Sequence, residues 1–436
     1  CRSGNYGCGC SRNNRCRHDN NRVNRRERNS NGKMRTSNLN RLLRHTAPHR
    51  FLLLCLPFTA SCSEGSVPEP CAELPTRTVL VYLAGDNNLE EIGRTPELLR
   101  QGWKDTGSKC LIYYDAPQAA PKLFALTIRH SDASSVLETV EEYPEENSSS
   151  AGVFGRVLAD VVRKYPSDSY GLIFASHGSG WLPCGALSDP TRTIDDRTPG
   201  TTGGAREMEI TDFAAAIPDH QFDFIIFEAC LMSGIEVAYE LRNKTDYLLA
   251  SSAELLVPGY APVYPTAFQS LFDTSLGVPQ ALEKFAGSYF NYIDTRNGAY
   301  RSATQSIVYT REMDALAILA GKTTGNTHGR WDDALLGKLQ HFDRPGSYGD
   351  IPARPRYFDF GQYMAYLAPE RQADLDALLR KTVVWKAATP EFMAGYNGFT
   401  ILTHSGLTTY IEQDEFPELN AAYKKTAWWK ATHVQK

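Results

Sequence analysis

The sequence lacks the features that mark three common classes of protein. Its apolar stretch near the start, Phe51–Ala60, is about ten residues long, whereas a helix needs about 20 to cross a bilayer. No Gly-Lys-Ser/Thr follows its glycines, and Gly85-Asp86-Asn87-Asn88 stands where a nucleotide-binding protein would place a Gly-rich loop. The cysteines and the histidine of residues 1–18 fit no standard zinc spacing. These absences argue against a membrane-spanning helix, a phosphate-binding loop and a zinc module.

The first 33 residues are almost without apolar side chains and hold eight Arg and four Cys. Such a segment cannot build a core, and we interpret it as read-through upstream of a start at Met34. Residues 34–61 predict a secretory signal, because basic residues precede a short apolar stretch and then small residues. The small residues before Cys62 resemble the lipobox of bacterial lipoproteins. We therefore expect Cys62 to carry lipid, with residues 62–76 as a tether.

Positive charge is scarce in the rest of the chain. Removing residues 1–61 takes away 13 Lys+Arg and 2 Asp+Glu, which moves the formal charge from −4 to −15. This balance argues against nucleic acid as a partner. It fits a protein that is exported and anchored by lipid in a bacterial outer membrane or at the cell surface. A disulfide between Cys71 and Cys110 is left open, and Cys184 is given no role.

Apolar runs that end in polar or turn residues predict the strands of an α/β fold. They cover residues 78–85, 109–115, 170–175, 222–232 and 247–252, with a hairpin at 123–143 and helical periodicity at 153–165 and 235–242. Alternating strands and helices indicate a mostly parallel sheet between two helical layers. In such sheets, sites form beyond the carboxyl ends of the strands at a switch point in strand order.

The second half of the sequence has a different pattern. Helices are expected at 279–294, 312–321, 331–342 and 362–379, with strands at 302–309 and 399–403. No Pro- or Gly/Ser-rich linker separates the halves, and no internal repeat is visible. We therefore divide the mature chain into a core at 77–265 and a mainly helical C-terminal part at 266–436 that packs on it.

Two of the predicted strands end on residues that can perform nucleophilic chemistry. The run that begins at Phe222 reaches Cys230, and the run from Tyr170 to Ala175 is followed by Ser176-His177-Gly178. Cys230 lies 53 residues after His177. A histidine about 50 residues before a cysteine is the spacing of caspase-type cysteine peptidases, in which the two residues meet only in the fold.

Four motifs resemble the clostripain family of cysteine peptidases, with matching order and spacing. They are Tyr82-Leu83-Ala84-Gly85-Asp86-Asn87-Asn88-Leu89-Glu90, Ser176-His177-Gly178-Ser179-Gly180-Trp181, Glu228-Ala229-Cys230-Leu231-Met232 and Tyr423-Lys424-Lys425-Thr426-Ala427-Trp428-Trp429. The resemblance extends from about Arg77 to the C-terminus. It implies a caspase-like three-layer α/β/α sandwich and a His/Cys dyad.

The chemistry that this pair would perform follows from the properties of a thiol. A free thiol is ionised to only a few per cent near neutral pH, so Cys230 needs His177 to take or offset its proton. The histidine would then protonate the leaving amine. The oxyanion needs preorganised N–H donors, and the resemblance points to the backbone groups of Gly178 and Cys230.

Substrate preference is less clearly specified. The family cleaves after Arg or Lys through an acidic pocket and commonly has Asp two residues before the cysteine, where this chain has Glu228. Family members also often read Pro-Gly-Asp-Gly-Trp where this chain has Pro258-Gly259-Tyr260-Ala261-Pro262. We expect Glu228 and Asp86 to bind substrate. The alternatives left open are that Glu228 is a structural acid satisfied by backbone donors, that Asp86 is a helix cap, and that the P1 preference is not basic.

The segment 184–207 between the two catalytic residues is polar and is expected to form an exposed loop. Family members can activate themselves by cutting such a loop, which makes Arg192, Arg197 and Arg206 candidate processing sites. No cofactor is needed for the chemistry, and a calcium requirement is left open because Asp195-Asp196 matches no defined calcium loop. The alternative function is that of an inactive surface lipoprotein that holds peptide in its cleft. The oligomeric state is not predicted.

Overall fold

We describe the protein from a computed structural model. The chain divides into two units, Cys1–Glu69 and Pro70–Lys436. The structure describes residues 76–433 except residue 88 and the segments 187–193, 197–205, 325–332 and 347–352, and all of these described residues belong to the second unit.

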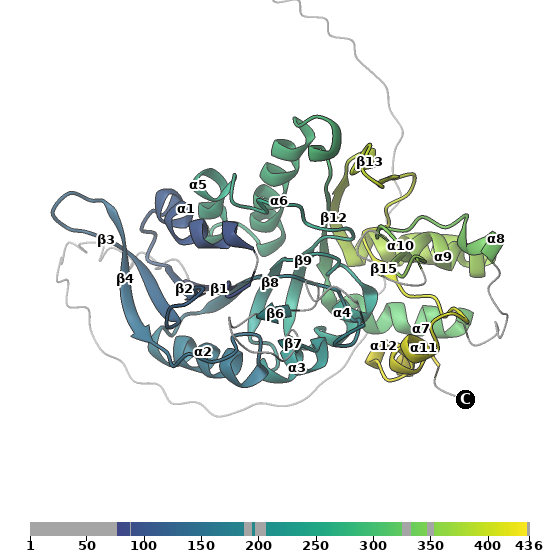
Figure 1. Cartoon of the computed structure of the whole chain (residues 1–436), viewed down its shortest axis with the longest axis horizontal. Coiled ribbons are helices and arrows are strands. Elements are labelled where there is room, and N and C mark those ends of the chain that lie inside the picture. Colours follow the sequence, from purple (N-terminus) through teal and green to yellow (C-terminus); the bar gives the residue numbers. More distant parts are fainter. Residues whose placement is uncertain are drawn as a thin grey trace, which may run out of the picture. The chain divides into compact units, whose positions relative to one another are not determined.

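A mixed nine-stranded sheet forms the centre of this part of the chain (Figure 1). Its strand order is β12-β10-β9-β8-β5-β1-β2-β3-β4. The inner strands β2, β1, β5, β8 and β9 are parallel, and antiparallel strands complete both sides. The bounds are β1 Arg77–Ala84, β2 Lys109–Asp115, β3 Lys122–Ile128, β4 Ser135–Glu142, β5 Ser169–Ala175, β8 Phe222–Glu228, β9 Thr245–Ala250, β10 Thr304–Tyr309 and β12 Val383–Ala388.

Helices cover both faces of the sheet (Figure 1). One layer contains α1 (Thr95–Gly102), α5 (Tyr264–Ala267) and α6 (Val278–Asp294), and the other contains α2 (Ala151–Lys164), α3 (Ile210–Ala216) and α4 (Ile235–Glu240). Side chains alternate between the two faces along a strand, so an inner strand contributes side chains to both layers. In β1, Leu80 and Tyr82 join the core under α2, whereas Val79 and Val81 join the core under α6. The expected caspase-like α/β/α sandwich is confirmed.

The C-terminal part supplies further helices and two strands of the main sheet. The helices are α7 Met313–Thr324, α8 Asp333–Leu336, α9 Phe360–Leu367, α10 Gln372–Thr382, α11 Pro417–Tyr423 and α12 Ala427–Thr432. The single helix expected at 362–379 is wrong: α9 ends before Pro369, since a residue that precedes proline avoids helical geometry. The helix expected at 331–342 is also shorter than predicted, covering only α8 within the described residues.

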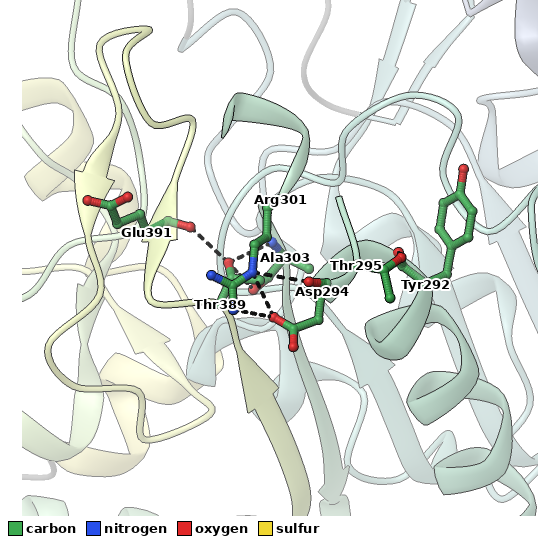
Figure 2. A network of polar contacts seen from close by, with 7 residues as sticks. All are labelled: Tyr292, Asp294, Thr295, Arg301, Ala303, Thr389 and Glu391. Carbon is green, nitrogen blue, oxygen red and sulfur yellow. Dashed lines mark hydrogen bonds and ion pairs between the residues drawn. The ribbon is translucent and has the colours of Figure 1, made fainter. Parts of the chain in front are cut away.

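The edge strand β12 is fastened at its end by a polar network (Figure 2). Thr389 exchanges hydrogen bonds with the backbone of Ala303, at 3.1 and 3.0 Å. Its hydroxyl also donates to the carbonyl of Glu391, at 2.8 Å. Beside it, Arg301 pairs with Asp294 at the end of α6, with nitrogen–oxygen distances of 2.9 and 2.7 Å. The network extends the ladder between β10 and β12 by one residue and ties it to α6.

Candidate active site

The site begins with the register of two parallel strands. Strands β5 and β8 are neighbours, and Ala175 pairs with Glu228. His177 lies two residues beyond the end of β5, and Cys230 lies two residues beyond the end of β8. Because adjacent strands lie about 4.8 Å apart, this register brings the imidazole and the thiol to the same edge of the sheet. Both residues line one pocket.

The pocket is open to solvent, and about 480 Å³ of space, part of it open solvent, lies between its walls. It lies beyond the carboxyl ends of the strands, near the switch point in strand order, where β2 is the neighbour of β1 on one side and β5 on the other. Its walls come from the segments that follow β1, β5, β8 and β9. The lining residues are Leu89, Glu91, Ile92, Thr95, Ala175, Ser176, His177, Glu228, Ala229, Cys230, Leu255, Val257, Pro258 and Gly259.

The loops after β5 and β8 approach each other backbone to backbone. A Cβ atom placed on Gly178 would lie 2.6 Å from the carbonyl oxygen of Cys230. Leu231 adopts a left-handed conformation, with φ of 62°, and its N–H donates to the carbonyl of Ala253 at 3.0 Å. Such a conformation costs a residue with a side chain about 1 to 2 kcal/mol. The fold therefore imposes a sharp turn directly after Cys230.

The sulfur of Cys230 has a backbone donor that the sequence did not reveal. The N–H of Leu255 donates to Sγ at 3.4 Å, and Leu255 belongs to the segment after β9. An N–H donor stabilises a thiolate more than a thiol. The segment that carries this donor also forms one wall of the pocket.

Glu228 has its carboxyl group engaged by the neighbouring segment. The N–H of Tyr260 donates to Oε1 at 2.7 Å, and the hydroxyl of Tyr264 donates to Oε2. Burial raises the pKa of Glu228 to about 7. Gly259, with φ of 60°, packs so closely that a Cβ atom there would lie 2.4 Å from Oε1. These contacts fit the structural role that the sequence left open for Glu228, and they form the base of the wall at 257–259.

The remaining candidates are distributed around the site. Asp86 follows β1 but is only 2% exposed and is not among the residues that line the pocket. The acid that this segment contributes to the pocket is Glu91, which lies in a 3-10 helix at Glu90–Arg94. Of the candidate processing residues, Arg206 begins the short strand β7 (Arg206–Met208), which pairs with β6 (Ile194–Asp196), and Arg192 and Arg197 lie outside the described residues.

The other cysteines differ from Cys230. Cys184 is exposed, and desolvation together with Glu209 raises the pKa of its thiol. Cys110 is a buried thiol without a disulfide partner among the described residues. Cys62 and Cys71 lie outside the described residues. In the described part of the chain, no group of three or more His, Cys, Asp or Glu residues could hold a metal ion, and no helix is long and apolar enough to cross a membrane.

Comparison with a family model gives the observation that decides the family. The model described as the clostripain family matches residues 81–318, a segment that contains both His177 and Cys230. The chain belongs to the clostripain family. Clostripain from Hathewaya histolytica is 26% identical over 290 residues, which are 59% of this chain and 52% of clostripain. The chain thus spans about half the length of that curated relative.

Solved clostripain-family structures share the architecture. An inactive zymogen C11 protease from Parabacteroides distasonis is 29% identical, with a TM-score of 0.67, over 82% of this chain and 98% of that chain. A secreted C11 cysteine protease from Bacteroides thetaiotaomicron, solved with an irreversible peptide inhibitor, is 25% identical, with a TM-score of 0.68, over 82% and 99%. These likenesses confirm the fold and the family that the motifs predicted.

Proposed function

We propose that the protein is a cysteine endopeptidase in which Cys230 is the nucleophile and His177 the general acid–base. The observation that carries the proposal is the parallel register of β5 and β8, which places both residues on one pocket. Membership of the clostripain family supports it, as does the peptide inhibitor bound by a structural relative.

The reaction would proceed through an acyl-enzyme. His177 takes the proton of Cys230, and the thiolate attacks the carbonyl carbon of the scissile peptide bond. His177 then gives the proton to the leaving amine, and water later releases the acyl group with His177 as the base. The N–H groups of Gly178 and Cys230 are the proposed donors to the oxyanion, and the close approach of their loops supports this pairing.

We further propose cleavage after Arg or Lys. Two carboxylates line the pocket, and their environments differ. Glu228 has both oxygens engaged and a pKa of about 7. The side chain of Glu91 is 45% exposed and meets Arg94 at 3.4 Å, a surface pair of the kind that contributes little. A basic P1 side chain would therefore compete with fewer existing partners at Glu91 than at Glu228.

A peptide library randomised at P1 tests the activity and its specificity together. The purified wild-type chain should cleave after Arg or Lys, and Cys230→Ala should not. Glu228→Gln and Glu91→Gln form a matched pair, because each removes one charge and keeps the shape of the side chain. If Glu91 supplies the pocket charge, Glu91→Gln alone should raise KM for basic substrates. If Glu228 supplies it, Glu228→Gln alone should do so. Cleavage after other residues would retain the mechanism and reject the basic preference, whereas no cleavage would favour a peptide-binding role.

Self-processing in the segment 184–207 is part of the proposal. Mass spectrometry of the incubated wild-type chain should show two fragments. Cys230→Ala should show only the intact chain. Changing Arg192, Arg197 and Arg206 to Gln one at a time identifies the cut. We propose that the chemistry itself needs no calcium. The same incubation with calcium or with a chelator tests this.

Export with a lipid anchor on Cys62 is also proposed. The relative from Bacteroides thetaiotaomicron is described as secreted, which supports export. Fractionation of expressing cells tests the anchor: the wild-type chain should sediment with membranes, and Cys62→Ser should not. A soluble wild-type chain would reject lipidation.

A further inference from the structure

Residues from the far C-terminal part contact both loops that carry the proposed dyad. We name these loops the His loop, residues 176–182, and the Cys loop, residues 230–234. The C-terminal contacts come from one small sheet in which β11 (Phe358–Asp359) pairs with β15 (Thr408–Thr409), from the residues that flank it, and from Tyr423 at the end of α11. None of this element falls within residues 81–318, the segment that the family model matches.

The His loop is held by a hydroxyl and by an aromatic cluster. The hydroxyl of Tyr357, directly before β11, donates to the carbonyl of Ser179 at 2.6 Å, and the contact is buried. Two residues further along, the ring of Trp181 lies 5.2 Å from the rings of both Tyr410 and Tyr423. Tyr423 opens the C-terminal motif that resembles the clostripain family, so this motif contacts the His loop.

The Cys loop is held by backbone and hydroxyl bonds from the other strand of the same small sheet. The N–H of Thr408 donates to the carbonyl of Ser233 at 2.9 Å. The hydroxyl of Ser233 donates to the carbonyl of Gly406 at 2.7 Å. Directly behind the loop, Oε1 of the buried Glu236 accepts bonds from the hydroxyl of Thr409, at 2.9 Å, and from the N–H of Tyr410, at 3.0 Å.

These contacts meet in one element. Phe358 pairs with Thr409, and Asp359 pairs with Thr408. The residue that holds the His loop and the residue that holds the Cys loop are thus joined through two adjacent hydrogen-bonded strands. We propose that this element, with Tyr357, Tyr410 and Tyr423, is a C-terminal brace that sets the position of His177 relative to Cys230, and that Tyr357 is a positioning residue. The proposal rests on the proposed dyad.

The physical reason is that proton transfer between the two side chains depends on their separation. Strands β5 and β8 fix the strand ends, but His177 and Cys230 each lie two residues beyond those ends. Without the brace, the Cys loop would keep its bonds to Ala253 and Ser251 in the segment after β9. The outer part of the His loop, at Ser179 and Trp181, would lose the contacts described above. A displacement of about 1 Å at a reacting group can cost about a hundredfold in rate.

The test compares two tyrosines that make the same kind of bond. Tyr357→Phe removes a buried hydroxyl that donates to a backbone carbonyl. Tyr82→Phe removes another, whose hydroxyl donates to the carbonyl of Ser148 at 2.7 Å, and it serves as the matched control. Ser233→Ala is the second variant, which loosens the Cys loop instead of the His loop. All are studied as the full chain, at a temperature where circular dichroism shows them folded.

The decisive readout is the rate at which iodoacetamide alkylates Cys230 between pH 5 and 9, measured by mass spectrometry of the peptide that contains it. Cys184 in the same sample is an internal reference. We expect Tyr357→Phe and Ser233→Ala to move the midpoint of this profile upward by about one pH unit, because less of the thiol is ionised by His177. We also expect kcat to fall about tenfold with KM nearly unchanged, and Tyr82→Phe to match the wild type.

Two outcomes separate the brace from the proposed function. If Tyr357→Phe and Ser233→Ala keep the alkylation profile of the wild type, the brace is overturned, whether or not peptides are cleaved. If the profile shifts but the wild type cleaves no peptide, the brace stands and the peptidase proposal fails.

Discussion

Replacing Gly178 by alanine should separate the His loop from the Cys loop. The new Cβ atom would lie 2.6 Å from the carbonyl oxygen of Cys230, 3.0 Å from Cβ of Ala229 and 3.1 Å from Sδ of Met232. An ordinary carbon–oxygen contact begins at about 3.3 Å, so the loops must move apart by about 0.7 Å. The nearest of these three atoms is a backbone oxygen, so rotation of a side chain cannot relieve that contact.

The displacement predicts effects on both stability and rate. Overpacking of this kind costs about 1 to 3 kcal/mol of the free energy of unfolding. A shift approaching 1 Å between nucleophile and base should lower kcat/KM by about ten- to a hundredfold. The assays are urea denaturation and the initial rate of hydrolysis of a fluorogenic peptide.

A glycine with open space around it is the control. Gly287 lies in α6 and has no atom within 4 Å of an added Cβ. Gly287→Ala should therefore keep wild-type activity and gain about 1 kcal/mol of stability from the higher helix propensity of alanine. Wild-type kcat/KM in Gly178→Ala would refute the close approach of the two loops.

Two buried titratable groups and the segment 184–207 give the remaining predictions. Burial raises the pKa of Glu236 from 4.5 to about 7, so the free energy of unfolding falls as pH rises from about 4.5 to 7. Glu236→Gln should remove about 3 kcal/mol of this fall, measured by urea denaturation at pH 5 and pH 8. A wild-type pH slope in the variant would contradict this. His404 forms a hydrogen bond with Ser252 at 3.1 Å, and burial lowers its pKa from 6.5 to about 3. The neutral imidazole therefore contributes to the free energy of unfolding above pH 6.5, and this contribution is lost as pH falls. His404→Gln should therefore flatten the loss of stability between pH 6.5 and 4, and an unchanged acid transition would count against it. Cutting within 184–207 should raise the rate of peptide hydrolysis in step with fragment appearance, and full activity of the uncut chain would show that processing is not required.

The inner strands of the sheet could be predicted because they are continuous apolar runs bounded by polar turns. Strands buried on both faces have this pattern, so β1, β2, β5, β8 and β9 were all anticipated. Strand β12 was not, because Val383 follows α10 without a turn signal. Its place in the sheet depends on pairing with β10, some 80 residues earlier, which no local pattern reports.

That His177 and Cys230 meet at one pocket could be predicted, because each lies two residues beyond a strand that the sequence identifies. The surroundings of Glu228 could not, since its partners Tyr260 and Tyr264 come from a segment more than 30 residues later. Asp86 also follows a strand, but whether such a residue faces the pocket or the interior depends on the turn that the chain then makes. The hydrogen bond of Tyr357 could not be predicted from the sequence either, because its partner Ser179 is 178 residues away.

In the proposed mechanism, His177 activates Cys230 for attack on a peptide carbonyl. The most direct test is reaction of the purified chain with a halomethyl ketone peptide ending in Lys, followed by mapping of the modified residue. We expect one adduct per chain, on Cys230, and we expect it to form about a hundredfold more slowly in His177→Ala. An adduct on Cys184 in place of Cys230, or equal rates with and without His177, would contradict it.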